Sequence, residues 1–256
     1  MQPQSLRQFL AELPHALFSL VYPDDCRICG RALVRASRVP VCKACLAAVE
    51  PLPAEAVCSR CGVPRENEAP VDGAGLCGSC RLELPEFDWA RGYGAYEGTL
   101  RHLIHLLKYA GMRPLARPLA ARLAALRAEA GPVDLIVAVP LHAGRQRTRG
   151  FNQAELLARE LSRVWGVSYE DGALRRIRAT ETQTGLTNRQ RRENVAGAFE
   201  ARRPWSVAGW NVLLVDDVIT TGATAASSAR ALKRAGAARV AVVALARARR
   251  QLVDLP

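Results

Sequence analysis

The stretch from Val212 to Thr224 constrains the fold of this chain more than any other part of its sequence. It begins with an uninterrupted apolar run, which predicts a β-strand buried on both faces, as in a parallel sheet covered by helices. Asp216 and Asp217 follow at the carboxyl end of this strand, then a threonine-rich turn, then an alanine-rich helix expected to begin near Thr224. Ligands of open α/β sheets bind beyond the carboxyl ends of the strands, so this turn is the first candidate binding site.

The turn has the chemistry of a sugar-phosphate site. Adjacent carboxylates accept hydrogen bonds from neighbouring ribose hydroxyls, and a turn that opens a helix offers unpaired N–H groups to an anion. A glycine in the turn lets the backbone approach a phosphate closely. The expected phosphate ligands are Thr220, Thr221, Gly222, Ala223 and Thr224. A buried strand that ends in a solvated turn is the alternative, and it explains less of the pattern.

The whole stretch resembles the signature of the type I phosphoribosyltransferases. The resemblance implies that Asp216 and Asp217 bind the ribose of phosphoribosyl pyrophosphate and that the following turn holds its 5′-phosphate. It also implies that Mg²⁺ bridges the pyrophosphate and hydroxyl oxygens of the ligand, with water completing its coordination.

A second buried strand is predicted over residues 134–140, and a basic segment follows it before a helix that runs through Glu160. A strand, a turn with N–H groups and basic residues again suit an anion. In the type I phosphoribosyltransferases the loop after the first core strand binds pyrophosphate. The resemblance therefore extends the candidate site to Leu141, His142 and Arg149. A solvated basic loop is the alternative.

The remaining pattern of residues 86–256 completes an α/β domain. We predict further strands over residues 91–96 and 239–245, and helices over 100–109 and 115–126. No Walker loop, GxGxxG, HExxH or nucleophile elbow is present, so the rival catalytic motifs are missing. The predicted fold is a doubly wound, mostly parallel sheet of the type I phosphoribosyltransferase kind.

All eight cysteines lie before this domain, in four CxxC pairs. The pairs are Cys26/Cys29, Cys42/Cys45, Cys58/Cys61 and Cys77/Cys80. Two such knuckles supply four thiolates to one tetrahedral zinc ion, so we predict two structural zinc ions, each bound by sequential pairs. Interleaved pairing stays open, and iron–sulfur ligation is the minor alternative. Disulfides would require an oxidising compartment.

Residues 3–22 carry apolar side chains at helical spacing, which predicts a helix that packs against the rest of the protein or lies on a membrane surface. No apolar run is long enough to span a bilayer, and Glu12 and Pro14 interrupt any signal-peptide core, so we expect a cytoplasmic protein. The expected domains are residues 1–85, a helix with a small double zinc ribbon, and residues 86–256.

The formal charge of +12 favours polyanionic partners. Arginine supplies most of it, which a GC-rich genome would also explain. The residues expected to contact nucleic acid are Arg145, Arg147, Arg189, Arg191 and Arg192.

A narrower resemblance covers almost the whole chain. Its motifs are Val139-Pro140-Leu141, Arg149-Gly-Phe-Asn-Gln153, Thr182-Gln183, Arg189, Arg192, Asn194-Val195 and Ala198-Phe199. With the double zinc ribbon and the Lys108-Tyr109 helix end, they are similar to the ComF family. Membership implies handling of single-stranded DNA during natural transformation, with other DNA-uptake proteins as partners, and it adds Lys108 to the candidate substrate-binding residues.

Three functional hypotheses follow. The first is a competence-type protein that binds phosphoribosyl pyrophosphate and single-stranded DNA. The second is a phosphoribosyltransferase of nucleotide metabolism, a glycosyltransferase for which residues 175–203 would form a mobile loop over the sugar. The third is a non-catalytic sensor of phosphoribosyl pyrophosphate. Turnover, the acceptor base and the oligomeric state do not follow from the sequence.

Overall fold

The computed structural model of the chain describes residues 25–33, 39–65, 75–178 and 188–249. The chain divides into two compact units, residues 1–49 and residues 50–256. The helix predicted over residues 3–22 lies outside the described residues. The domain boundary expected near residue 85 stays a prediction.

Unit 1 contains a single short helix among its described residues, α2 (Lys43–Ala47). Before it, an isolated antiparallel bridge joins Asp25 to Ala32 and closes a tight turn around the first CxxC pair. The backbone N–H of Gly30 donates to the carbonyl of Cys26 at 2.8 Å, and Gly30 has a φ of +69°, which favours glycine. The second CxxC pair begins at Cys42, which caps α2 by accepting a hydrogen bond from the N–H of Cys45.

Unit 2 is built on a five-stranded sheet in which every pairing is parallel. In spatial order the strands are β1 (Trp89–Ala95), β7 (Arg239–Arg247), β6 (Asn211–Ile219), β2 (Leu135–Ala138) and β3 (Ser168–Tyr169). The central strands β2, β6 and β7 are apolar and almost entirely buried, as expected for a sheet covered on both faces. The predicted parallel α/β fold is confirmed.

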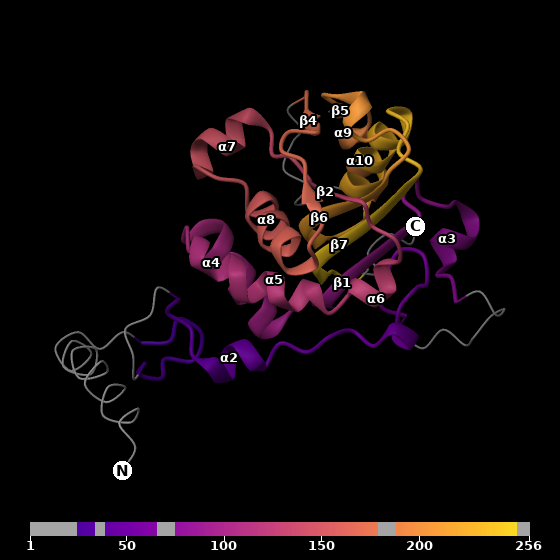
Figure 1. Ribbon diagram of the computed structural model, residues 1–256. Coiled ribbons are helices and arrows are strands. Elements are labelled where there is room, and N and C mark those ends of the chain that lie inside the picture. Colours follow the sequence, from indigo (N-terminus) through magenta and orange to yellow (C-terminus); the bar gives the residue numbers. More distant parts are fainter. Residues whose placement is uncertain (1–24, 34–38, 66–74, 179–187, 250–256) are drawn as a thin grey trace, which may run out of the picture. The chain divides into compact units, whose positions relative to one another are not determined.

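Helices cover both faces of this sheet (Figure 1). On one side lie α4 (Gly98–Tyr109), α5 (Ala116–Ala124) and α8 (Gln153–Trp165), with α5 packed against α8. On the other side lies α10 (Ala223–Arg234), whose small alanine and serine side chains allow close approach to the strands. The short elements η2 (Arg113–Leu115) and α6 (Arg127–Ala130) flank α5 in the chain.

A smaller antiparallel sheet of β4 (Leu174–Arg176) and β5 (Phe199–Ala201) packs with α9 (Asn188–Val195) on α10. The short helix η3 (Pro204–Ser206) follows β5. The sequence predicted a polar loop across this region, whereas its described part is ordered secondary structure. Residues 179–187, including Thr182 and Gln183, lie outside the described residues.

The second pair of CxxC motifs belongs to unit 2 and enters its core. Its elements are η1 (Ala54–Ala56), an antiparallel bridge between Val57 and Pro64, and α3 (Gly78–Leu82). Cys58, Cys61, Cys77 and Cys80 share one buried cluster with residues of β1, β2, β6, β7 and α10. Val63 and Phe87 complete the contact between these cysteines and the sheet.

Two predicted features near the candidate site differ from the structure. Strand β6 continues through Ile219, so Asp216 and Asp217 lie within it rather than after it. The reason is its neighbour β7, which pairs with β6 as far as Ile219 and Arg247. The basic segment after β2 is not a loop but a helix, α7 (Ala143–Arg149), which Gly150 ends with a φ of +74°.

Candidate functional site

A cleft of about 240 Å³ opens at the carboxyl ends of β2 and β6. It brings together residues that are far apart in the sequence, from α4, α7, β6 and the start of α10. Of the predicted substrate-binding residues, those that line it are Lys108, Leu141, Arg149, Asp216, Asp217, Thr220, Gly222 and Thr224. The predicted nucleic-acid residue Arg145 lines the same cleft. The cleft therefore combines an acidic floor with a basic wall.

The floor of the cleft is a buried ion pair. The Lys108 Nζ lies 2.9 Å from Asp217 Oδ1, and their side chains are 15% and 6% exposed. The other oxygen of this carboxylate, Asp217 Oδ2, is buried and has no hydrogen-bond partner among the described residues. Burial opposes the charge on Lys108, but the charges of Asp217 and Asp216 outweigh it and raise the pKa of Lys108. The Lys108 side chain is therefore positively charged in the cleft.

Asp216 has a different environment from its neighbour. Burial and the charge of Asp217 together raise the pKa of Asp216 to about 7, while the positive charge of Lys108 opposes the shift. One oxygen of Asp216 accepts the backbone N–H of Asp217 at 2.8 Å. The cleft thus holds two carboxylates of which one takes up a proton near neutral pH, so a cation or a donor group placed there would stabilise its charged form.

The turn after β6 presents the N-terminus of α10 to the cleft. Gly222 stands at the cap position with a φ of +86°, a left-handed conformation that L side chains rarely adopt. Thr221 Oγ1 accepts the backbone N–H of Ala223 at 3.3 Å, which fixes the shape of the turn. The helix continues for three turns beyond it, so its dipole favours an anion at this end.

The opposite wall comes from the junction of α7 and α8. Asn152 caps α8 through the N–H of Ala154 and donates to the carbonyl of Val139 at 3.0 Å, so it ties the helix start to the end of β2. Arg149 donates to Gln153 Oε1 at 2.8 Å and stacks on the ring of Tyr109, 5.3 Å from its centre. These contacts hold the Arg149 guanidinium at the edge of the cleft.

Ten lining residues were not among the predicted site residues, and those with polar or aromatic side chains are Tyr96, Tyr109, Asn152, Gln153 and Arg176. The family motifs included Tyr109, Asn152 and Gln153, so a signal for these three was present. Arg176 comes from the small sheet and stacks on Phe199 at 5.3 Å. Burial and the charge of Arg145 lower the pKa of Arg176, and Asp216 opposes this shift. Two arginines from different elements thus repel one another across the cleft.

Other predicted residues lie elsewhere. His142 caps α7, where its Nδ1 accepts the N–H of Gly144 at 3.3 Å. Thr221 and Ala223 line a separate cavity on the other side of the turn. Arg147 is exposed on α7. Arg189, Arg191 and Arg192 lie on α9, but their side chains are outside the described part of the structure.

The eight cysteines form two clusters, each made of sequential CxxC pairs. The first cluster is Cys26, Cys29, Cys42 and Cys45, and the second cluster is Cys58, Cys61, Cys77 and Cys80. In each, all four sulfur atoms lie within 4.8 Å of one another. The sequential pairing predicted from the sequence is confirmed, and the interleaved alternative is wrong.

The sulfur spacing fits zinc. A tetrahedron with Zn–S bonds of about 2.3 Å has sulfur–sulfur edges of about 3.8 Å. The Sγ atoms of Cys26 and Cys45 lie 3.8 Å apart, as do those of Cys29 and Cys42, and those of Cys61 and Cys77 lie 3.7 Å apart. Backbone N–H groups also point at the sulfurs, from Cys42 to Cys26 Sγ and from Cys77 to Cys58 Sγ, both at 3.3 Å. Four thiolates that close the shell are typical of a structural site.

Among the residues that the structure describes, no helix is long and apolar enough to cross a membrane.

Comparison with known proteins defines the class of the molecule. Residues 17–81 match the double zinc ribbon domain, and residues 147–255 match the phosphoribosyl transferase domain. The chain is therefore a phosphoribosyltransferase-like protein with an N-terminal double zinc ribbon.

Two relatives place it more narrowly. The DNA utilization protein YhgH of Salmonella typhi is 35% identical over 234 residues, which cover 89% of this chain and 99% of that protein. Competence protein F of Haemophilus influenzae is 33% identical over 215 residues, 81% of this chain and 90% of that protein. The chain belongs to this family, the ComF family. Among solved structures it is similar to glutamine phosphoribosylpyrophosphate (PRPP) amidotransferase from B. subtilis complexed with ADP and GMP, with 25% identity and a TM-score of 0.37. That match covers 52% of this chain and 26% of the amidotransferase.

Proposed function

We propose that this protein binds phosphoribosyl pyrophosphate with Mg²⁺ in the cleft and single-stranded DNA on its basic surface, as a cytoplasmic protein of DNA uptake. One observation carries the first part. The acidic pair of β6, the helix-opening turn and the arginines of two other elements converge on one cleft. A ribose, a 5′-phosphate and a pyrophosphate need these three environments in this order.

The roles of the residues follow from their chemistry. Asp216 and Asp217 accept hydrogen bonds from the ribose hydroxyls, and the buried Asp217 Oδ2 has an acceptor position for one of them. The turn from Thr220 to Thr224 holds the 5′-phosphate at the start of α10. Arg145, Arg149 and Arg176 supply positive charge for the pyrophosphate. An anion between them would relieve the repulsion that lowers the pKa of Arg176.

The donor set of the cleft also fits magnesium. Mg²⁺ binds through one or two carboxylates and the oxygens of its phosphate ligand and keeps several waters. Asp216 and Asp217 are the carboxylates that would hold it, and bound Mg²⁺ would neutralise charge on the pyrophosphate. Without a cation, two carboxylates would repel this ligand, although Lys108 offsets part of their charge.

Calorimetric titration with phosphoribosyl pyrophosphate, with and without Mg²⁺, tests this proposal. Asp216→Asn with Asp217→Asn keeps the side-chain size but removes two charges and weakens the acceptors. Gly222→Val places a branched side chain where the φ is +86° and the backbone must approach the phosphate. Both variants should fold, retain zinc and lose the ligand. Wild-type affinity in both variants would overturn the assignment.

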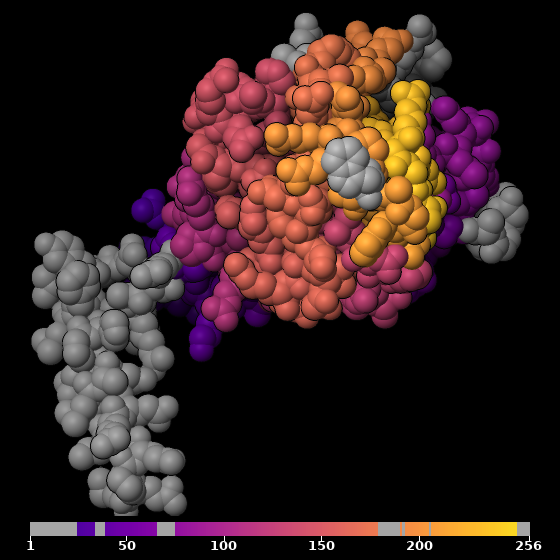
Figure 2. Space-filling model, turned by 45° about the horizontal axis from the view of Figure 1, so that its top comes forward, coloured from indigo at the N-terminus to yellow at the C-terminus, as the bar shows by residue number. Residues whose placement is uncertain are grey.

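The single-stranded DNA part of the proposal rests on the names of the relatives and on charge. Helix α7 carries Arg145 and Arg147, and α9 carries three further arginines. Figure 2 shows the residues of α7 and α8, in shades of red, on one face of unit 2. Residues later in the chain, in orange, lie on the same face. The net charge of +12 favours a polyanion that runs over this face.

Salt dependence tests the DNA surface. Each single-strand phosphate that the protein neutralises should contribute about −0.7 to the slope of log affinity against log salt. Changing Arg189, Arg191 and Arg192 together to Ala should lower both the affinity and this slope. If neither changes, α9 is not part of the DNA surface.

A transferase activity is the second candidate, and one observation favours it. Arg149 covers part of the Tyr109 ring at the edge of the cleft, but the residue is 70% exposed, which leaves ring surface on which an acceptor base can stack. Pyrophosphate release measured with each nucleobase in turn separates the candidates. Base-dependent release supports an enzyme, and ligand binding without release supports a binding protein or a sensor of phosphoribosyl pyrophosphate.

A further inference from the structure

Two buried arginines reach the second cysteine cluster from neighbouring strands of the sheet. Arg91 of β1 is 6% exposed, and its Nη1 donates to the carbonyl of Cys58 at 3.0 Å. Arg247 at the end of β7 is 1% exposed, and its Nε donates to the carbonyl of Cys61 at 3.0 Å. Both ends of one CxxC knuckle are therefore held by a guanidinium. A divalent ion bound by four thiolates leaves net negative charge, which these buried cations complement.

The remaining contacts of the two arginines differ. Arg91 directs its Nε to Glu129, at 2.9 Å. Arg247 directs its Nη1 to the carbonyls of Ile219, at 3.0 Å, and Thr220. Those two carbonyls begin the turn that opens α10. The Arg247 side chain thus joins the backbone of the second cysteine cluster directly to the backbone of the phosphate-binding turn.

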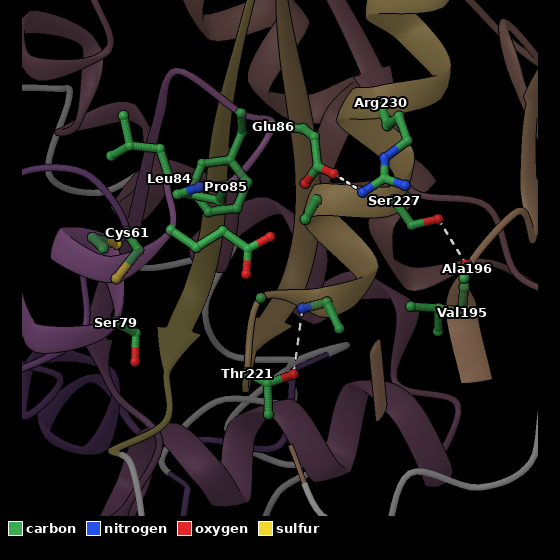
Figure 3. A pocket seen from close by; sticks show the side chains of 16 residues that line it. Cys61, Ser79, Leu84, Pro85, Glu86, Val195, Ala196, Thr221, Ser227 and Arg230 are labelled. Atoms are coloured by element: carbon green, nitrogen blue, oxygen red, sulfur yellow. Dashed lines mark hydrogen bonds and ion pairs between the residues drawn. The ribbon is translucent and has the colours of Figure 1, made fainter. Parts of the chain in front are cut away.

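A cavity of about 120 Å³ separates the cluster from the turn on the side of α10. Figure 3 shows Cys61 and Ser79 on one side of this cavity, Ser227 and Arg230 of α10 on the other, and Thr221 at the foot of the helix. Apolar packing through Phe87 also connects the cluster with the turn, but on the side of the cavity the space between them is open. The guanidinium of Arg247 is a rigid planar fork whose donors lie in fixed directions, so it adds a directional polar link to that packing.

The Arg247 side chain also has little freedom to move. It leaves β7 where β1 passes very closely, since a Cβ built on Gly92 would lie 2.5 Å from the backbone nitrogen of Arg247 and 2.7 Å from its Cβ. Glycine at this position lets the two strands approach, and the approach confines the start of the Arg247 side chain.

We propose that Arg247 is a positioning residue that holds the phosphate-binding turn in place against the second cysteine cluster, and this inference rests on the proposed binding of phosphoribosyl pyrophosphate. Arg247 does not touch the ligand. It holds the carbonyl of Thr220 and shares the carbonyl of Ile219 with the backbone N–H of Ala248, at 2.9 Å, so that the N–H groups after them face the 5′-phosphate. The second cluster thereby contributes to ligand affinity, although none of its cysteines lines the binding cleft.

Hydrogen–deuterium exchange on the ligand-free full-length protein tests the connection directly. In Arg247→Lys the charge stays but the fork is lost, so zinc should be retained while exchange in residues 218–224 rises about tenfold or more, because charged hydrogen bonds to the turn are removed. Arg247→Met removes the charge as well and should have a larger effect. The matched control is Arg91→Lys, which disturbs the same knuckle but not the turn, and exchange in residues 218–224 should then match the wild type.

Ligand binding provides a second readout. Affinity for phosphoribosyl pyrophosphate should fall about tenfold in Arg247→Lys, while affinity for inorganic pyrophosphate, held by the arginines of the opposite wall, should stay unchanged. Wild-type exchange in Arg247→Lys, or an equal rise in Arg91→Lys, would overturn the positioning role. If the wild-type protein fails to bind phosphoribosyl pyrophosphate, the proposed function falls, and the exchange result still decides whether Arg247 holds the turn.

Discussion

The two cysteine clusters have nearly the same sequence pattern but different places in the molecule. Both consist of sequential CxxC pairs with sulfur atoms 3.7–3.8 Å apart where pairs face each other. In the first cluster Cys29 is exposed and Cys42 and Cys45 are partly exposed, whereas all four cysteines of the second cluster are buried. The first belongs to a separate compact unit, and the second lies in the core that also contains β6 and α10.

This difference shows that ligand chemistry alone does not define what a zinc ribbon does. Among the described residues of unit 1, the buried apolar side chains are Cys26, Val41 and Val49, so a metal is the main source of stability for the first cluster. The second cluster adds metal bonds to an existing hydrophobic core that packs against the sheet. Its loss should therefore affect the domain that carries the cleft.

The largest expected effect comes from removing one ligand in each cluster. Cys58→Ser should destabilise unit 2 by more than about 4 kcal/mol, because a buried metal site loses its shell. Cys42→Ser should loosen the first cluster and leave the melting of unit 2 unchanged. Calorimetric unfolding of both variants, with zinc analysis, measures the difference. Equal destabilisation of unit 2 would abolish the distinction between the clusters.

A smaller effect is expected at the glycine that follows the first knuckle of each cluster. Gly30 and Gly62 have φ values of +69° and +66°, so alanine costs about 1–2 kcal/mol at either position. Nothing lies within 4 Å of a Cβ at Gly30, whereas a Cβ at Gly62 would lie 2.5 Å from the carbonyl oxygen of Ala90.

Gly62→Ala should therefore cost clearly more stability than Gly30→Ala, because β1 and the Cys58/Cys61 knuckle must move apart. Denaturant unfolding of the two variants gives the comparison. If the two variants lose the same free energy of unfolding within error, the Cys58/Cys61 knuckle is not packed on β1 as tightly as the structure shows.

A third effect depends on pH and concerns the cleft itself, where ionised Asp216 should destabilise unit 2. Its pKa is about 7 in the folded protein and 3.8 ordinarily, so the folded state holds the proton more tightly. The corresponding stability is present at low pH and is lost as the pH rises from about 4 to 7. Asp216→Asn should then be more stable than the wild type at pH 8 by roughly 1–3 kcal/mol, and this gain should shrink at pH 5.

The same measurement in a Cys42→Ser background separates the cleft from the first cluster. The pH dependence of stability should persist in that background, because Asp216 and the second cluster lie in the same compact unit. A gain from Asp216→Asn that is the same at pH 5 and pH 8 would show that Asp216 does not titrate in this range.

The sequence predicted the features that reside in contiguous residues. The stretch from Val212 to Thr224 and the four CxxC pairs were recognised because each carries its chemistry within a short segment. Arg176 and Arg247 were not, because their roles depend on partners far away in the chain. Arg247 donates to Cys61, 186 positions earlier, and in the sequence it was one of many basic residues near the C-terminus.

Pairing between strands that are distant in the sequence also decides where an element ends, and the local sequence does not show it. Strand β6 extends past its apolar run because β7 continues beside it. Nothing in the sequence of the two clusters indicates that one is more buried than the other. Burial depends on which strand each knuckle meets, and Gly62 packs on β1 while Gly30 has open space around it.

The most direct test of this account is a titration of the wild-type and Cys42→Ser proteins with phosphoribosyl pyrophosphate and Mg²⁺, side by side. We expect one ligand per chain and equal affinity in both proteins, while the zinc content falls from about two ions per chain to about one in Cys42→Ser. If neither protein binds, the proposed ligand is wrong. If the wild type binds and Cys42→Ser loses its affinity, the ligand cleft depends on the first cluster and not on the second cluster alone.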